Sequence, residues 1–181
     1  MPPAEARLEQ TDSGLKPATE GWFVVNVGKT GWAVHDSFGS GCTFEGHDAQ
    51  FKQLGINISV VEPGQPLCLY HEESAQEDFL VLAGECLLLI EEEERPLKAW
   101  DFVHCPPGTD HSFVGAGDGP CVIFMTGARG ENKEIFYPRS ELAISHGSGV
   151  EQETSSPSEA YAPFPKWKDG RPNSWDGLPW G

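Results

Sequence analysis

Short runs of β-branched and aromatic residues, separated by turn residues, limit most strongly how this chain can fold. Its 181 residues include 21 Gly and 15 Pro, which mark the turns between the runs. No amphipathic helical pattern lies between consecutive runs. The expected strands are residues 22–27, 42–44, 54–62, 67–73, 79–90, 99–105, 111–114 and 121–126. Many short strands in close succession predict an all-β sandwich or barrel and argue against a parallel α/β sheet.

The chain divides by composition into three parts. Residues 1–20 are polar and lack hydrophobic periodicity, so we expect a flexible N-terminal arm. Residues 21–128 contain the strand runs and are expected to form one barrel domain. Residues 129–181 are expected to form a C-terminal extension. Within it, residues 140–147 and 156–161 begin with serine at a capping position, which predicts two short helices.

The end of this extension is rich in Pro and carries Trp167, Trp175 and Trp180. A large aromatic ring gains most when other groups cover it. We therefore expect the tail to pack on the barrel or on a second subunit, and a disordered tail is the alternative.

The formal net charge of -16 bears on partners and location. Nucleic acids and anionic membranes are usually bound through Lys and Arg patches, so we expect neither as a partner. The N-terminus has no basic segment followed by an apolar core, and no apolar run is long enough to cross a bilayer. We expect a soluble cytoplasmic protein. The five cysteines contain no C-x-x-C pair, which indicates reduced core thiols.

Two histidines and two glutamates are the candidate metal ligands. His71 and Glu73 are two residues apart on an expected strand, so their side chains share one face. Glu77 follows a short polar turn, and His111 follows a rigid Pro-Pro-Gly corner. Two imidazoles with one or two carboxylates suit one divalent ion, with Fe(II), Mn(II), Ni(II) and Zn(II) as the candidates.

The segment around these residues resembles the cupin superfamily. The first cupin motif runs from a glycine through His-x-His to a glutamate and, after six intervening residues, a second glycine. Here Gly64 opens the segment, His71 takes the place of the first histidine, Glu77 that of the glutamate and Gly84 that of the final glycine. The resemblance implies a double-stranded β-helix, or jelly-roll barrel, that holds a metal through His71, Glu73, Glu77 and His111.

The second cupin motif is matched at its centre and not at its ends. Residues 106–111, Pro-Pro-Gly-Thr-Asp-His, fit the motif's Pro-x-Gly-x-x-His. Trp100 stands where the motif has a glycine, and Gly115 stands where it has an asparagine.

The first motif also departs at its second histidine. Glu73 occupies that position if His71 is the first histidine. A second register would place Tyr70 and Glu72 at the two histidine positions. We prefer the register that uses His71, because imidazole is the commoner ligand.

Cupins include dioxygenases, decarboxylases, sugar isomerases and epimerases, and modules that only bind a ligand. The resemblance implies a metal-binding cupin, and we expect an oxygen-dependent, dioxygenase-like oxidoreductase acting on a small oxygen-rich molecule. One alternative is a non-catalytic ligand-binding module. Another is a metal-free sugar isomerase or epimerase, which would need Tyr70 or Tyr137 to face the cavity. Cupins commonly pair through barrel edges, so the resemblance also implies a homodimer.

Overall fold

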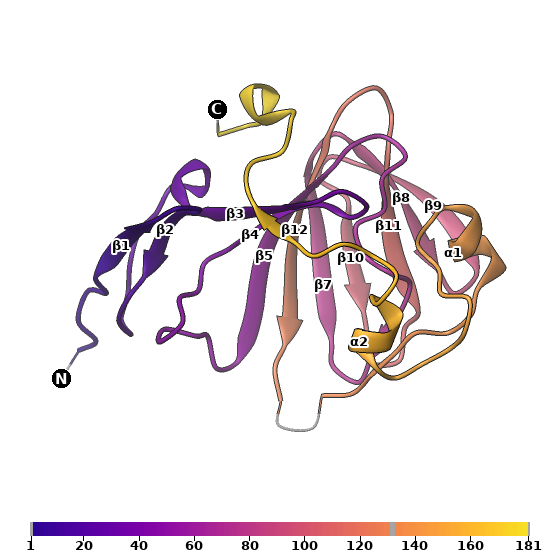
Figure 1. Ribbon diagram of the computed structural model, residues 1–181, viewed down its shortest axis with the longest axis horizontal. Helices are drawn as coiled ribbons and strands as arrows, with labels where there is room; N and C mark the ends of the chain where they lie inside the picture. The colour runs from indigo at the N-terminus through magenta and orange to yellow at the C-terminus, as the bar shows by residue number, and fades with distance from the viewer. Residues whose placement is uncertain (1, 131–132, 181) are drawn as a thin grey trace.

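Two antiparallel sheets form the body of the protein in this computed structural model, which describes residues 2–130 and 133–180 (Figure 1). The larger sheet has the order β10-β7-β12-β5-β4-β3-β14 and the smaller one β11-β8-β9. The larger sheet consists of β3 (Gly31–His35), β4 (Gly39–Thr43), β5 (Leu54–Val61), β7 (Glu77–Ala83), β10 (Phe102–Cys105), β12 (Cys121–Ala128) and β14 (Lys168–Asp169). The smaller consists of β8 (Glu85–Ile90), β9 (Glu93–Lys98) and β11 (His111–Ala116). The prediction of an all-β fold is confirmed.

The alternation of side chains along the strands creates two apolar layers. Val61, Phe79 and Ile123 from the larger sheet pack with Leu88 and Phe113 from the smaller one, which fills the space between the sheets. Side chains of the opposite parity form a separate cluster on the outer face of the larger sheet. The space between the sheets is therefore the barrel interior, and the positions that share a face with Val61 and Ile123 point into it.

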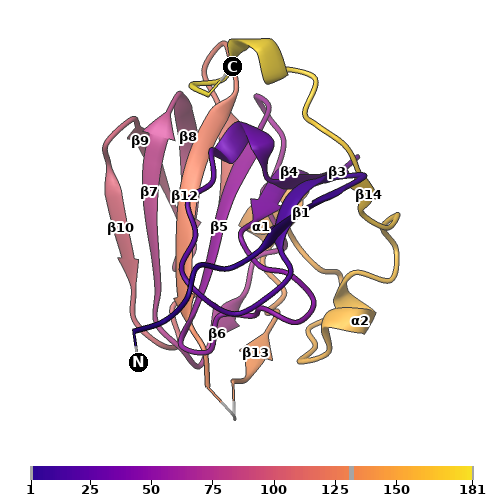
Figure 2. The ribbon, with the colours of Figure 1, turned by 90° about the vertical axis from the view of Figure 1, so that its left-hand side faces the viewer.

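The N-terminal segment contains a β-hairpin. β1 (Leu8–Thr11) pairs with β2 (Gly14–Pro17), and the hairpin lies against the start of β3 (Figures 1 and 2). Residues 8–17 of the expected flexible arm therefore form regular structure. Only one of its eight strand residues is buried, so the hairpin leaves no hydrophobic periodicity in the sequence. Gly14 has φ 137°, and a Cβ there would lie 2.1 Å from the Thr30 carbonyl oxygen.

The expected strand at residues 22–27 is absent, and β3 begins at Gly31 instead. Trp22 makes a single bridge to Glu5, and residues Val27–Lys29 form a 3₁₀ helix, η1. Val24 is 83% exposed. Residues of high β-propensity form a strand only where a partner strand lies beside them, and none pairs along this described segment.

The C-terminal extension adds two short helices and two short strands to the barrel. Its two short helices, α1 (Glu141–Ser145) and α2 (Pro157–Ala160), begin after the predicted serine caps. The remaining short elements are β6 (Glu72–Glu73), β13 (Ile135–Phe136), which pairs with β6, and η2 (Trp175–Gly177). Among the described residues no helix is long and apolar enough to cross a membrane.

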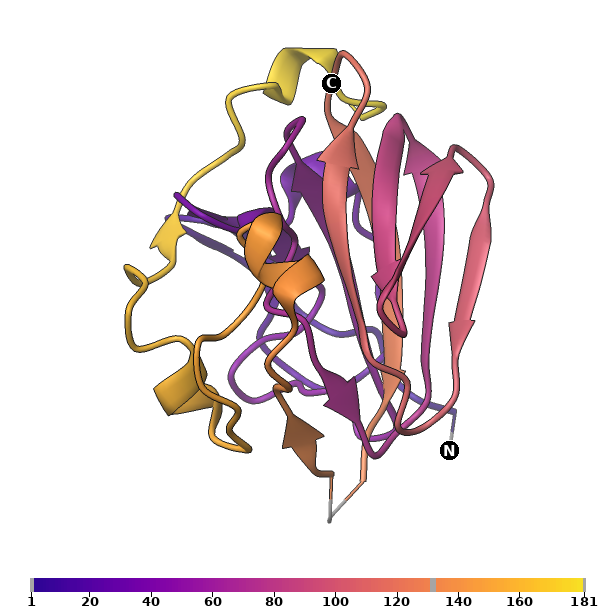
Figure 3. The ribbon, with the colours of Figure 1, turned by 90° about the vertical axis from the view of Figure 1, so that its right-hand side faces the viewer.

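The tail of the extension packs on the outer face of the larger sheet (Figure 3). The rings of Trp175 and Trp180 lie 5.4 and 5.2 Å from the buried ring of Trp32 in β3. Near its start, β14 adds a short edge strand to β3. The extension is therefore part of the barrel's sheet, although it lies outside the expected barrel range of residues 21–128.

The backbone explains one departure from the second cupin motif and not the other. A Cβ at Gly115 would lie 2.1 Å from the Glu62 carbonyl oxygen, so the asparagine of the motif cannot fit there. Trp100, which replaces the glycine of the motif, keeps a glycine-like φ of 77° while its side chain is 74% exposed. A tryptophan in this region is strained and gains little from burial.

The Trp100→Gly substitution is therefore expected to stabilise the protein. Relief of left-handed strain outweighs the entropy cost of a new glycine, so the free energy of unfolding should rise by roughly 0.5–1 kcal/mol. Urea denaturation of wild type and variant measures this change. A lower free energy of unfolding in the variant would show that the exposed ring makes stabilising contacts.

Candidate metal centre

His71 and His111 are held side by side by their own backbones. His71 immediately precedes β6, and His111 is the first residue of β11. The His71 amide donates to the His111 carbonyl at 3.1 Å, and the His111 amide donates to the His71 carbonyl at 2.9 Å. Residues directly opposite in an antiparallel pair point to the same face. The two imidazole rings consequently lie 4.9 Å apart inside the barrel.

Backbone carbonyls set the orientation of both rings. His71 Nδ1 lies 2.7 Å from the Leu69 carbonyl oxygen, and His111 Nδ1 lies 2.9 Å from the Thr109 carbonyl oxygen. A carbonyl oxygen only accepts hydrogen bonds, so each Nδ1 carries the proton. Both Nε2 atoms therefore present a lone pair, which is the arrangement found in metal-ligating histidines.

Glu77 brings a third acceptor to the same place. It is the first residue of β7, and its Oε2 lies 3.4 Å from His111 Nε2 and 4.0 Å from His71 Nε2. Glu77 Oε2 is buried and has no hydrogen-bond partner. One ligand atom from each of the three residues lies within 4.8 Å of the others. Three converging acceptors without a donor among them require a proton or a cation, so the donor set fits a divalent metal ion.

The surroundings favour neutral forms of all three side chains. Burial lowers the pKa of His111 to about 4, with a further contribution from nearby His71. Burial also lowers the pKa of His71. Burial first, and then the charge of Glu73, raise the pKa of Glu77 to about 8. At neutral pH both imidazoles are therefore available as ligands, whereas Glu77 must release a proton before it can bind a cation.

Glu73 lies beside the three residues and is not one of the converging group. Its carboxylate forms an ion pair with Lys133, which comes from the segment after β12, and it lines the same cavity. Tyr70 and Glu72, the residues of the second register, are placed elsewhere. The Tyr70 hydroxyl accepts from the Glu92 amide at 3.1 Å, and Glu72 pairs with Phe136 in β13. The structure thus brings His71, Glu77 and His111 together and leaves Glu73 at the side.

A cavity of about 310 Å³ opens around these residues. Its apolar wall is formed by Leu67, Phe79, Phe113 and Met125. Polar and cationic groups also line it: Asn57, Cys68, Thr126, Arg129 and Lys133. We did not single out these polar residues from the sequence, since none of them belongs to a motif and Lys133 lies in the C-terminal extension. A partly apolar cavity with cationic side chains suits a small anionic or oxygen-rich molecule.

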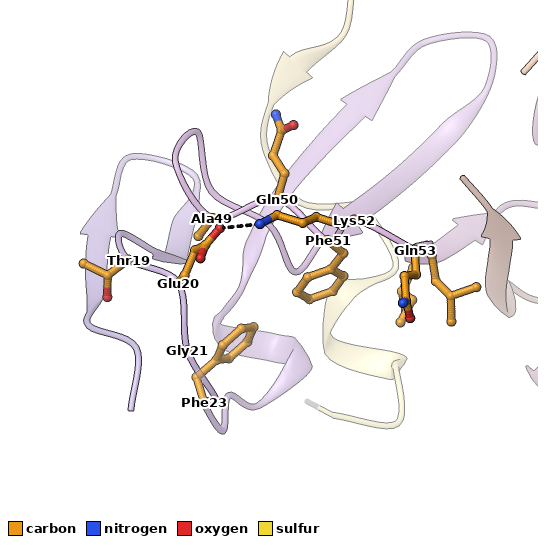
Figure 4. A pocket seen from close by; sticks show the side chains of 11 residues that line it. Thr19, Glu20, Gly21, Phe23, Ala49, Gln50, Phe51, Lys52 and Gln53 are labelled. Carbon is orange, nitrogen blue, oxygen red and sulfur yellow. Dashed lines mark ion pairs between the residues drawn. The ribbon is translucent and has the colours of Figure 1, made fainter. Parts of the chain in front are cut away.

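A second hollow, of about 550 Å³, lies between the N-terminal segment and the loop before β5 (Figure 4). Phe23, Phe51 and Leu54 form its apolar surface, and Glu20 and Lys52 form an ion pair of 3.2 Å across it. None of its described lining residues is His or Cys. The candidate site for a metal, or for a carboxyl group with a shifted pKa, is therefore the smaller cavity inside the barrel.

Comparison with known families identifies the family that this architecture resembles. Residues 57–127 match the family model for the cupin domain, and this range contains His71, Glu77 and His111. Residues 57–127 are thus a cupin domain, and the fold is the cupin double-stranded β-helix. No match is found among curated proteins.

Solved structures show the same fold in proteins of different names. A sugar phosphate isomerase of the cupin superfamily from Silicibacter pomeroyi is 21% identical, and the match covers 66% of this chain and 83% of that chain with a TM-score of 0.57. The polyketide cyclase RemF from Streptomyces resistomycificus is 13% identical over 59% of this chain and 79% of that chain, with a TM-score of 0.52. At these identities the likeness extends to the fold.

A putative sugar phosphate isomerase from Acidithiobacillus ferrooxidans is 28% identical, and the match covers 46% of this chain with a TM-score of 0.45. The match spans 55% of the length of that protein.

Proposed function

We propose that this protein binds one divalent transition metal through His71, Glu77 and His111 and acts as an oxygen-dependent, dioxygenase-like enzyme. The observation that carries the proposal is the convergence of two imidazole lone pairs and a buried, unpartnered carboxylate oxygen on one point. Two histidines with one carboxylate are the donor set of non-haem iron oxygenases, in which the metal, when bound, supplies open positions for substrate and dioxygen. Fe(II) is the expected ion for this activity, and Mn(II), Ni(II) and Zn(II) also suit the donors.

The side chains around the metal centre define what the substrate would meet. Lys133 and Arg129 line the cavity, where they pair with Glu73 and Glu45. Asn57 adds an amide group, so the site favours a small molecule with a carboxylate or several oxygens that can bind the metal. The apolar wall that includes Phe79 and Phe113 excludes water from one side. Glu73 lies at the cavity without belonging to the donor set, and in this proposal it takes up a proton from the substrate.

The alternative functions make different demands on the same cavity. A metal-free isomerase would use tyrosine together with histidine, yet no tyrosine is among the described residues that line the cavity. Tyr70 is buried against Leu89 and Val114. The ring of Tyr137 lies 5.7 Å from that of His71, so Tyr137 is the tyrosine that this alternative would use, although it does not line the cavity. A non-catalytic module would share the metal centre and differ only in turnover. The homodimer and the cytoplasmic location stay predictions.

Metal content of the purified protein tests the first half of the proposal. After reconstitution with Fe(II), Mn(II), Ni(II) or Zn(II), we expect about one ion per chain in wild type. His71→Ala and His111→Ala each remove a ligand, so their metal affinity should fall by more than about 100-fold, the upper range for changes to residues that only support a ligand. The matched control is His104→Ala, since His104 pairs with Asp78 at 2.6 Å on the surface. Metal absent from folded wild type, or retained in both cavity variants, would contradict the site.

Oxygen consumption tests the second half. The Fe(II) form is screened in an oxygen electrode with small carboxylic acids and phenols, beside the His111→Ala variant as a blank. Substrate-dependent uptake in wild type alone supports an oxygenase. A tight metal centre without uptake for any of these substrates would favour the ligand-binding module.

A further inference from the structure

The inner faces of β3 and β4 carry only small side chains from Gly31 to Ala33 and from Gly41 to Thr43. Gly31 in β3 pairs with Thr43 in β4, and Ala33 pairs with Gly41. Gly41 in turn pairs with Ser59 in β5, two residues from Val61 of the core between the sheets. Because directly paired residues share a face, all of these positions point into the barrel. This part of the sheet therefore leaves its inner surface open where other parts fill it with large apolar residues.

The open space is a chamber of about 390 Å³. Leu67, Met125 and Trp167 provide its larger apolar walls. Trp167 belongs to the C-terminal tail, where it immediately precedes β14, and it is 47% exposed. The tail thus closes one side of the chamber, as it runs past the edge of the larger sheet (Figure 3). The charged side chains among its lining residues are Lys16 and Asp169.

This chamber adjoins the cavity of the metal centre. Asn57, Leu67, Cys68 and Met125 line both spaces. The two spaces therefore lie on either side of these four side chains, and a molecule that extends from His71 and His111 past Met125 would enter the chamber. The two ends differ in chemistry, since the metal end carries carboxylates and cations whereas the chamber is bounded by small side chains, a thioether and an indole ring.

We infer that the chamber binds the apolar body of an elongated substrate whose oxygen-bearing head reaches the metal centre. The substrate class is an amphipathic small molecule, with a carboxylate or vicinal oxygens at one end and a ring-sized apolar group at the other. The position of the substrate's oxygen-bearing head rests on the proposed function. The position of its apolar body is inferred from the shape of the chamber. Gly41 sets the depth of the chamber, and Trp167 forms its outer wall.

Binding of 2-naphthoate to the zinc-loaded protein, measured by calorimetry, tests the inference without turnover. Gly41→Val places a branched side chain in the chamber, because a Cβ at Gly41 meets only Ser59 Oγ at 3.3 Å and the Ile58 carbonyl oxygen at 3.7 Å. The control is Gly119→Val, since a Cβ there meets nothing within 4 Å. We expect naphthoate to bind about tenfold or more weakly to Gly41→Val, because burial of one or two methylene-sized groups is lost. Zinc content and the affinity of the control should equal those of wild type.

Other results separate this inference from the metal centre. Equal naphthoate affinity in folded wild type and Gly41→Val would overturn the inference, as would a zinc-loaded wild type that does not bind naphthoate. If Gly41→Val does not fold by circular dichroism, Ala33→Leu fills the same chamber from β3 and gives the same readout. A wild type that holds no zinc would instead overturn the proposed function. Binding of neutral 2-naphthol to the metal-free protein, with loss in Gly41→Val, would then support the chamber alone, and equal binding would overturn it.

Discussion

The Glu77→Gln variant is expected to lose metal binding and, in its metal-free form, to be more stable than wild type at alkaline pH. Glutamine is nearly the same size as glutamate and carries no charge, so it removes the anionic ligand while filling the same space. The two imidazoles remain, but a neutral amide oxygen is a poor substitute for a carboxylate with a transition metal. Zinc affinity, measured by competition with a chelator, should fall by more than about 100-fold.

The stability effect follows from the raised pKa of Glu77. Burial and the neighbouring Glu73 raise this pKa from 4.5 to about 8 in the metal-free protein. A carboxyl group whose pKa is higher in the folded state stabilises the fold at low pH, and this contribution is lost as pH rises from about 4.5 through about 8. Wild type should therefore lose stability across this window, whereas Glu77→Gln should not. Above pH 8 the difference should be on the order of a few kcal/mol.

Denaturation of the metal-free proteins at pH 5 and pH 9 measures this difference. The effects of His71 and His111, whose lowered pKa values destabilise the fold below their ordinary value of 6.5, are present in both proteins and cancel in the comparison. Glu153→Gln is the control, because Glu153 is exposed and does not line the metal cavity. An identical pH dependence in wild type and Glu77→Gln would show that Glu77 is already ionised and stabilised without metal.

The candidate site could be predicted where its geometry is local and could not where it depends on distant segments. His111 follows a rigid Pro-Pro-Gly corner, and His71 and Glu77 stand at motif spacing, so the sequence indicated all three residues. Glu73 has the same strand parity as His71, which suggested a ligand. Its carboxylate is instead paired with Lys133, sixty positions further along the chain. Strand parity shows which way a side chain points and not which charged group arrives beside it.

The fold divides in the same way. The central strands were predictable because they combine high β-propensity with clear turns. Glu91 and Glu92 form the turn between β8 and β9, with φ values of 49° and 61° that usually require Asn or Gly. The strands β1, β2 and β3 were missed. The first two bury few side chains and show no hydrophobic alternation, and β3 is a short run that begins at Gly31. We expected the tail tryptophans to pack against the barrel or a second subunit. The sequence did not indicate that Trp32 is the ring on which Trp175 and Trp180 pack.

Phe113→Ala is expected to cause the largest loss of stability in the barrel. Phe113 is fully buried between the two sheets, and its ring lies 4.7 Å from that of Phe79. Truncation of a buried phenylalanine leaves a void that a closed barrel cannot easily fill. The free energy of unfolding should fall by about 3–5 kcal/mol. Urea denaturation measures this loss, and Phe113→Leu, which keeps much of the apolar volume, should lose clearly less.

The same substitution reaches the metal centre through the packing. Phe79 lies between Phe113 and His111, with its ring 5.2 Å from the imidazole, and both phenylalanines line the metal cavity. If the aromatic wall holds the His111 ring in place, zinc affinity should fall in folded Phe113→Ala and recover in part in Phe113→Leu. Unchanged zinc affinity in the destabilised variant would mean that the Thr109 carbonyl and the backbone pairing with His71 orient the ligand without help from the core. Either result separates packing from hydrogen bonding as the cause of ligand position, because both variants leave the His111 backbone partners unaltered.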